Sequence, residues 1–225
     1  MYRKYFKRIV DILCAIAAIV VFSWLYIIVA VLVRVNLGSP VIFRQPRPGK
    51  DGKIFNLYKF RSMTSECDDH GNLLTDEQRL TRFGRFLRKT SLDELPEAFN
   101  ILMGSMSVVG PRPQLVRDMV FFTDEQMKRQ SVTPGLTGLA QISGRNGITW
   151  EEKIEYDLKY IENITFVGDV KIIFLTVWKA FVKSEGVSQE GMDTAEDLGD
   201  YLLRTGKVGK NEYEELQIKA RELIG

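Results

Sequence analysis

"ILCAIAAIVVFSWLYIIVAVLV", residues 12–33, is the stretch that decides the fold of this chain. It runs for 22 positions without a charged residue. As an α-helix it would be about 33 Å long, enough to reach across the hydrocarbon core of a bilayer. It is apolar on every face, which disfavours a helix buried in a soluble core. The sequence therefore predicts a membrane anchor over residues 1–36.

Basic residues flank this run on both sides. They are Arg3, Lys4, Lys7 and Arg8 before it, and Arg34, Arg44, Arg47, Lys50 and Lys53 after it. Basic flanks mark the cytoplasmic side, so a helix that dips into the membrane and returns would satisfy both flanks, and a spanning helix is the alternative. A re-entrant helix must bend, and Ser23 could cause the bend by bonding back to a carbonyl four residues earlier. The residues alone leave the re-entrant and the spanning form equally open.

The composition limits the chemistry that the chain can perform. Its 225 residues include 31 Lys or Arg and 29 Asp or Glu, a net charge of +2 that gives no indication of a nucleic-acid partner. Two cysteines suggest neither a disulfide framework nor a zinc cluster. With a single histidine, metal sites built from several histidines are excluded, so acid–base chemistry is expected to depend on carboxylates.

Turn residues and β-branched or apolar residues predict a hairpin after the anchor. Its strands are expected over residues 41–45 and 54–63, around the turn "PRPGKDGK". Residues 66–80 read as a polar loop. Residues 81–90, "TRFGRFLRKT", form a basic amphipathic stretch, which either lies on an anionic lipid surface or is an ordinary surface helix.

Three further helices are predicted over residues 114–130, 149–163 and 169–183, the last of them capped by Asp169, with a glycine-rich loop over 131–147. We assign residues 37–188 to one domain that follows the anchor. Residues 189–225 then form a tail with a helix over 211–223, which could bind a partner. The expected class is α+β: a helix-rich, membrane-associated fold with a short β-hairpin and surface amphipathic helices.

The stretch "SLDELPEAFN", residues 91–100, places two acids side by side. Ser91 and Glu94 fit a capping box at the start of a helix. Alternatively, Asp93 is a nucleophile, because a carboxylate can attack phosphorus and form an acyl phosphate. A helix N-terminus would lower the pKa of Asp93. Adjacent side chains on a helix point about 100° apart, so the two acids should have different roles.

Arg112 lies between Pro111 and Pro113, which stiffen the backbone that presents it. Such a guanidinium suits a bidentate grip on phosphate, although a structural turn with a surface arginine is the simpler alternative. The loop over 131–147 contains Arg145, and its glycines would let backbone amides approach an anion. The sequence contains no P-loop or strand-linked dinucleotide motif.

Four ordered motifs together resemble a known family. They are "KRIVDIL" (7–13), "GSPVIFRQPRPGKDGKIFNLYKFRSM" (38–63), "TRFGRFLRKTSLDELPEAFNILMGSMSVVGPRP" (81–113) and "VTPGLTGLAQISGRN" (132–146). The chain is similar over residues 1–188 to bacterial sugar transferases of the monotopic phosphoglycosyl transferase superfamily, and most similar to the small single-domain type.

The resemblance implies transfer of a sugar phosphate from a UDP-sugar to undecaprenyl phosphate, with release of UMP. It implies Mg²⁺ as cofactor and a place among the membrane lipids at the cytoplasmic face of the bacterial inner membrane. It also implies a role for six residues: Asp93 as nucleophile and Mg²⁺ ligand, Glu94 as its partner, Arg112 and Arg88 as phosphate ligands, and Lys59 and Arg145 as UDP-sugar ligands.

The chain departs from the family at the anchor. The family's helix bends at a Ser-Pro pair, whereas Ser23 is followed here by Trp24. The basic flanks on both sides still favour re-entry, so we expect the monotopic fold of the family, with an N-terminal re-entrant helix over residues 1–36. The resemblance also implies that residues 37–188 form the catalytic domain. Two other functions stay open: a silent membrane scaffold that binds lipid headgroups, and a phosphohydrolase that uses the same carboxylate with water as acceptor. The transferred sugar and the oligomeric state, including a homo-oligomer, also stay open.

Overall fold

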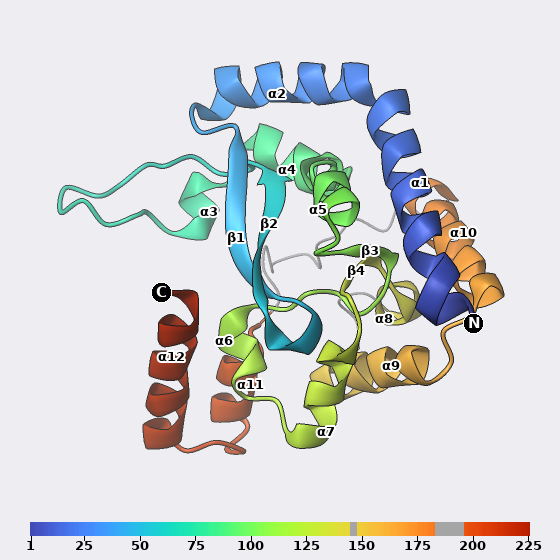
Figure 1. Cartoon of the computed structure of the whole chain (residues 1–225). Coiled ribbons are helices and arrows are strands. Elements are labelled where there is room, and N and C mark those ends of the chain that lie inside the picture. The colour runs from blue at the N-terminus through green and yellow to red at the C-terminus, as the bar shows by residue number, and fades with distance from the viewer. Residues whose placement is uncertain (145–147, 183–195) are drawn as a thin grey trace.

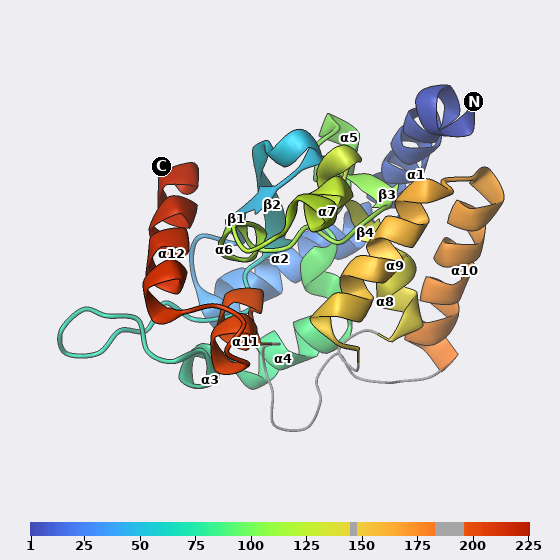
Figure 2. The same ribbon diagram turned by 90° about the horizontal axis from the view of Figure 1, so that it is seen from below.

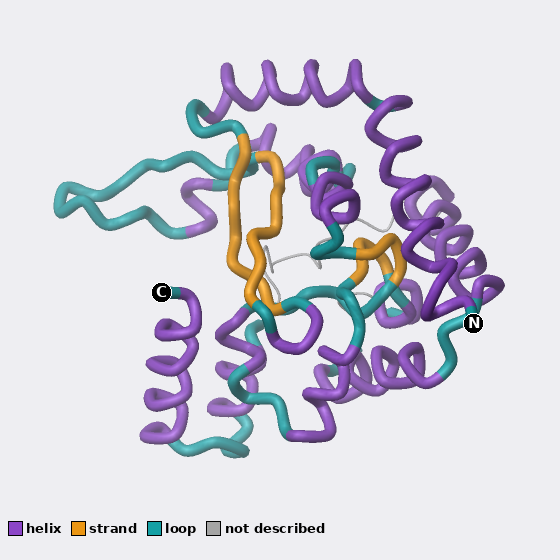
Figure 3. Tube along the Cα trace, viewed as in Figure 1, coloured by secondary structure: helices purple, strands orange, loops and turns teal. Residues whose placement is uncertain are grey.

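The computed structural model describes residues 1–144, 148–182 and 196–225. Helices dominate these ranges, and the strands form two sheets of two strands each (Figure 3). The predicted α+β class and the predominance of helices are therefore confirmed, whereas membrane association remains a prediction.

The N-terminal region is a bent pair of helices. A π-helical turn η1 (Tyr2–Phe6) leads into α1 (Lys7–Val21), and α2 (Ser23–Leu37) follows at 65° (Figure 1). The predicted position of the bend is confirmed, but its predicted cause is wrong. Among the described residues the Ser23 hydroxyl makes no hydrogen bond to a carbonyl. The backbone of Phe22, at φ −98° and ψ 12°, leaves the helical conformation instead.

No single helix in the described part of the chain has the length and hydropathy to cross a bilayer, whereas the bent pair together has both. One face of α2 packs on the protein. Val29, Val33 and Leu37 recur every four residues and are buried against Phe60 and Leu87. The remaining apolar side chains of α2 are largely exposed, so this helix is buried on one side only.

The predicted hairpin is present, formed by β1 (Ile42–Pro48) and β2 (Ile54–Phe60) in antiparallel register. The prediction that the first strand ends at residue 45 is wrong, because Pro46 and Pro48 lie opposite Asn56 and Ile54. Residues two apart in a strand face the same way, so both prolines can turn their missing N–H away from the single partner strand. The turn contains the 3₁₀ segment η2 (Lys50–Gly52).

A short parallel pair of strands was not predicted. It consists of β3 (Ser107–Val109) and β4 (Gly135–Thr137), the latter within the expected loop. Gly135 serves this pairing: a Cβ atom there would lie 2.0 Å from the backbone nitrogen of Gly110. We expected the glycines of this loop to let backbone amides approach an anion. At Gly135 the structure shows a different need, the close approach of two backbones.

The remaining elements are helices that range from 3 to 17 residues in length (Figure 1). They are α3 (Asp76–Arg79), α4 (Arg82–Lys89), η3 (Leu92–Glu94), α5 (Glu97–Met103), α6 (Val116–Met119), α7 (Asp124–Met127), η4 (Lys128–Ser131), α8 (Leu139–Ser143), α9 (Trp150–Glu162), α10 (Phe166–Val182), α11 (Leu198–Arg204) and α12 (Lys210–Ile224). The helices predicted over 81–90 and 149–163 are confirmed. The helix predicted over 114–130 is broken into three.

Asp169 does not cap α10, contrary to the prediction. The helix begins three residues earlier, and Thr165 accepts a hydrogen bond from the backbone of Gly168 in the first turn. The Asp169 carboxylate is buried and accepts hydrogen bonds from three side chains: Lys7 Nζ at 2.6 Å, and the hydroxyls of Tyr2 and Tyr160 at 2.8 Å each. It therefore ties η1 and the start of α1 to α9 and α10.

The two C-terminal helices pack side by side at one edge of the molecule (Figure 2). The helix predicted over 211–223 is confirmed as α12, and its Ala220 is buried against Val116 and Met119 of α6. The Asp118 carboxylate accepts a hydrogen bond of 2.9 Å from the backbone nitrogen of Leu198 at the start of α11. This C-terminal segment therefore packs on the rest of the protein.

Candidate active site

The two adjacent acids do not form a helix cap. Asp93 and Glu94 lie in the 3₁₀ turn η3, and α5 begins only at Glu97. Ser91 has left-handed backbone angles (φ 55°) and makes no capping hydrogen bond, so the predicted capping box is wrong. The Glu94 side chain is therefore free to contact residues distant in sequence.

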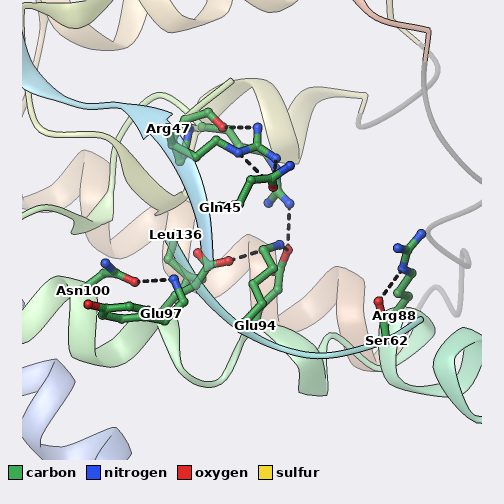
Figure 4. Close-up of polar contacts among 12 residues, drawn as sticks. Gln45, Arg47, Ser62, Arg88, Glu94, Glu97, Asn100 and Leu136 are labelled. Atoms are coloured by element: carbon green, nitrogen blue, oxygen red, sulfur yellow. Dashed lines mark hydrogen bonds and ion pairs between the residues drawn. The ribbon is translucent and has the colours of Figure 1, made fainter. Parts of the chain in front are cut away.

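Glu94 is held between two cations from different parts of the chain (Figure 4). Its Oε1 accepts hydrogen bonds from Arg112 Nη2 at 2.7 Å and from Lys59 Nζ of β2 at 2.9 Å. Burial alone would raise the pKa of Glu94, but the charges and hydrogen bonds of Arg112 and Lys59 outweigh it and hold this pKa below its ordinary value. Glu94 is therefore a carboxylate at neutral pH.

Asp93, one residue away, is in a different state. Its side chain is buried, and among the described residues it makes no hydrogen bond or ion pair. Burial raises its pKa to about 6, partly offset by the nearby charge of Lys59. The lowered pKa that we expected from a helix dipole is thus wrong, because a single 3₁₀ turn has almost no aligned dipole and burial dominates. A carboxylate that lies near cations but has no hydrogen-bond partner among the described residues is suited to nucleophilic attack.

Sequence reasoning missed a third acid of the site, Glu97. It is buried at the start of α5, and its Oε1 lies 3.2 Å from Lys59 Nζ. Burial, with the charge of Glu94, raises its pKa to about 7. Its spacing of three residues from Glu94 was the available signal, because such positions share a helical face. Lys59 thus lies between two carboxylates.

Asn100 fixes the distance between the carboxylates and Lys59. Its side chain accepts a hydrogen bond from the backbone nitrogen of Tyr58 at 2.9 Å and donates one to the carbonyl of Asn56 at 2.7 Å. Asn100 is fully buried on the face of α5 that carries Glu97. It therefore joins α5 to β2 at the two residues that flank Leu57, next to Lys59 in the strand.

The remaining predicted ligands are placed differently. Arg112 is only half-buried and engages Glu94, so it is more than a surface arginine in a turn. Arg88 donates a hydrogen bond of 3.0 Å to Ser62 Oγ and lies apart from Glu94 (Figure 4). Its charge still opposes the raised pKa of Asp93. Arg145 lies outside the described residues.

The acids of this site fit Mg²⁺ only in a limited role. In residues 1–144, 148–182 and 196–225, no group of three or more acids, histidines or cysteines is arranged to hold a metal. Mg²⁺ keeps several waters and needs only one or two carboxylates when substrate phosphates complete its shell. Asp93, whose oxygens have no protein partner among the described residues, fits that limited role.

Known proteins that resemble this chain are named as transferases of sugars or sugar phosphates. The chain is similar to an uncharacterized sugar transferase, EpsL, of Bacillus subtilis (strain 168), with 50% identity over 190 residues, which are 84% of this chain and 94% of that protein. It is 46% identical over 187 residues to a UDP-glucose:undecaprenyl-phosphate glucose-1-phosphate transferase of Klebsiella pneumoniae, covering 79% of this chain but 40% of the relative.

A third relative carries a different sugar in its name. It is the UDP-N-acetylgalactosamine-undecaprenyl-phosphate N-acetylgalactosaminephosphotransferase of Aeromonas hydrophila, 40% identical over 185 residues, which are 77% of this chain and 43% of that protein. The sequence profile of the family described as bacterial sugar transferase matches residues 2–183. The family predicted from the sequence is therefore confirmed: this chain belongs to the bacterial sugar transferases.

Proposed function

We propose that the chain transfers a sugar 1-phosphate from a UDP-sugar to undecaprenyl phosphate and releases UMP, through a covalent intermediate on Asp93. The observation that carries the proposal is the contrast between two adjacent acids. Glu94 is ionised and paired with two cations, whereas Asp93 is buried and has no partner among the described residues. The names of two relatives supply the reaction class, and they differ in the sugar.

The first half-reaction begins at the ionised Asp93 carboxylate. One of its oxygens attacks the phosphorus that carries the sugar, a P–O bond forms, and the P–O bond to UMP breaks. Lys59 and Arg112 lie beside this point and offset the charge of the diphosphate, and Glu94 holds both cations in place. Bound Mg²⁺ would offset further phosphate charge, with Asp93 as its protein ligand.

The second half-reaction restores the enzyme. A phosphate oxygen of undecaprenyl phosphate attacks the same phosphorus, and the bond to Asp93 breaks. The product is a sugar diphosphate linked to the polyprenol, and the carboxylate is regenerated as an anion. No proton has to be transferred in either step when Asp93 is ionised at the outset.

The anchor supports a place for this reaction in the membrane. Apolar side chains along α1 and α2 are exposed; they include Leu13, Val20, Trp24, Ile27 and Val31. A soluble protein rarely leaves such a large apolar surface uncovered. We propose that the bent pair is a re-entrant anchor at the cytoplasmic face of the bacterial inner membrane, where the polyprenyl acceptor also lies.

The test uses the full chain in lipid nanodiscs with undecaprenyl phosphate, Mg²⁺ and a panel of UDP-sugars, and measures UMP. We expect release with at least one sugar, and an adduct of sugar phosphate on the intact protein when the acceptor is omitted. Asp93→Asn should abolish both, while Asp69→Asn, an exposed acid in the 66–80 loop, should change neither. Normal turnover by Asp93→Asn would show that Asp93 is not the nucleophile.

The same assay separates the other two functions. A phosphohydrolase would release free sugar phosphate without the acceptor. A scaffold would release no UMP with any donor.

A further inference from the structure

The backbone around Arg112 is held through its carbonyl oxygens. Neither Pro111 nor Pro113 has an N–H to donate, so a carbonyl is the only backbone group through which either can be held. Three successive carbonyls are each engaged from a different element. Pro111 O accepts from Gly135 N of β4 at 2.9 Å, Arg112 O from Arg129 Nη2 at 2.8 Å, and Pro113 O from Arg47 Nη1 at 3.0 Å.

The donor to the central carbonyl is itself held rigidly. Arg129, in η4, is 2% exposed, and its Nε and Nη2 donate to Asp157 Oδ2 at 3.1 and 2.6 Å. Asp157 is buried in the middle of α9, 28 positions further along the chain. A planar guanidinium with two fixed bonds to one carboxylate has little freedom left, so the third bond fixes the position of Arg112 O.

We infer that Arg129, held by Asp157, is a positioning residue for Arg112, and that it keeps the Arg112 guanidinium within reach of Glu94 and of a substrate phosphate. This inference rests on the proposed function. The Arg112 side chain extends from a residue that has a proline on each side in the sequence. A small rotation at residue 112 would therefore move its guanidinium away from Glu94, 2.7 Å from it now.

A purely structural role makes a different prediction. A buried ion pair can usually be replaced by apolar residues of similar volume with little loss of stability, whereas loss of one partner leaves a costly unpaired charge. The double variant Arg129→Met/Asp157→Leu should therefore keep the fold and remove only the donor to Arg112 O. If the pair only stabilised the fold, the double variant would change catalysis only as far as it changed stability.

The experiment compares this double variant in the wild-type and Arg112→Ala backgrounds, with UMP release as the readout. We expect kcat/KM to fall about tenfold or more in the wild-type background and less than about twofold in the Arg112→Ala background, because the effect acts through Arg112. Lys128→Met is the matched control; Lys128 is the exposed neighbour of Arg129 and pairs with Glu125. An equal loss in both backgrounds would overturn the inference.

Hydrogen–deuterium exchange supplies a readout that does not depend on turnover. The amides of Leu115 and Gly135, which donate to Asp118 Oδ2 and Pro111 O, should exchange several-fold faster in the double variant. In Lys128→Met both should exchange at the wild-type rate. Unchanged exchange in the double variant would overturn the inference, even if activity fell. If the wild-type protein released no UMP with any donor, the proposed function would fail, and exchange would still show whether Arg129 holds this segment.

Discussion

Glu94 Oε1 lies 2.7 Å from Arg112 Nη2, although 18 positions separate the two residues. One lies in a 3₁₀ turn before α5, and the other follows β3 between two prolines. Lys59 reaches the same oxygen from the hairpin. Three elements thus meet at one carboxylate. Its neighbour Asp93 has no such partner among the described residues. Of the two adjacent acids, Glu94 is therefore held in place by cations, whereas the Asp93 carboxylate is free to react.

The pH dependence of the first half-reaction should report Asp93. The pKa of this group is raised to about 6, so the carboxylate is ionised above that pH and protonated below it. We expect adduct formation to be flat above about pH 7 and to fall about tenfold per unit below about pH 6. Single-turnover measurement without undecaprenyl phosphate avoids the titration of the acceptor, whose phosphate also has a pKa of about 6.

Glu97 also titrates in this range, so the profile is repeated with Glu97→Gln. An acid limb that persists in this variant belongs to Asp93. A rate that stays constant down to about pH 4 would contradict the assignment.

Glu97→Gln should stabilise the protein in a pH-dependent way. The pKa of Glu97 is raised from 4.5 to about 7, so between these values the folded state binds more protons than the unfolded state. Stability contributed by this group therefore falls as the pH rises through that window. The free energy of unfolding of Glu97→Gln should match wild type near pH 4.5. At about pH 8 it should exceed wild type by roughly 1–3 kcal/mol, measured by urea unfolding.

Glu155→Gln serves as the control for that experiment, because Glu155 lies exposed on α9. Its difference from wild type should be the same at both pH values. A Glu97→Gln protein that is less stable than wild type at the higher pH would refute the prediction.

Glu94→Gln should impair catalysis strongly. The amide keeps the shape of the side chain but removes the charge that holds Lys59 and Arg112 together. We expect kcat/KM for UMP release to fall about a hundredfold or more, as when a preorganised electrostatic contact is removed. Glu125→Gln, which removes the carboxylate of an exposed pair with Lys128, should leave it unchanged. Activity of Glu94→Gln within about threefold of wild type would show that Glu94 does not organise the cations.

The bend of the anchor can be tested with proline. Trp24 is the second residue of α2, and its N–H makes none of the hydrogen bonds that join α1 and α2. Proline is tolerated in the first turn of a helix but costs about 3 kcal/mol in its interior. Trp24→Pro should therefore preserve activity and thermal stability in nanodiscs, whereas Ile28→Pro should destabilise the protein.

The topology gives a further check of the anchor. Reporters fused before residue 1 and after residue 225 should both be cytoplasmic. A periplasmic N-terminus in the wild-type chain would show that α1 and α2 span the membrane.

Local patterns predicted much of the architecture because short-range physics decides it. The uncharged run predicted the N-terminal helical region, turn residues predicted the hairpin, and the amphipathic pattern predicted α4 and α9. The strands β3 and β4 have three residues each, too few for any periodicity, and they form only because they pair with each other. Asp169 looked like a cap, whereas it binds side chains that only folding brings to it.

By itself, the sequence determined the family, the two adjacent acids and the arginine between prolines, because these depend on residue identity and order along the chain. Tertiary structure alone decided that Glu94 is the paired acid, that Glu97 belongs to the site, and that burial raises the pKa of Asp93. The physical reason is that pairing and desolvation depend on distances between elements, and these distances arise only when the hairpin, η3 and the segment after β3 pack together.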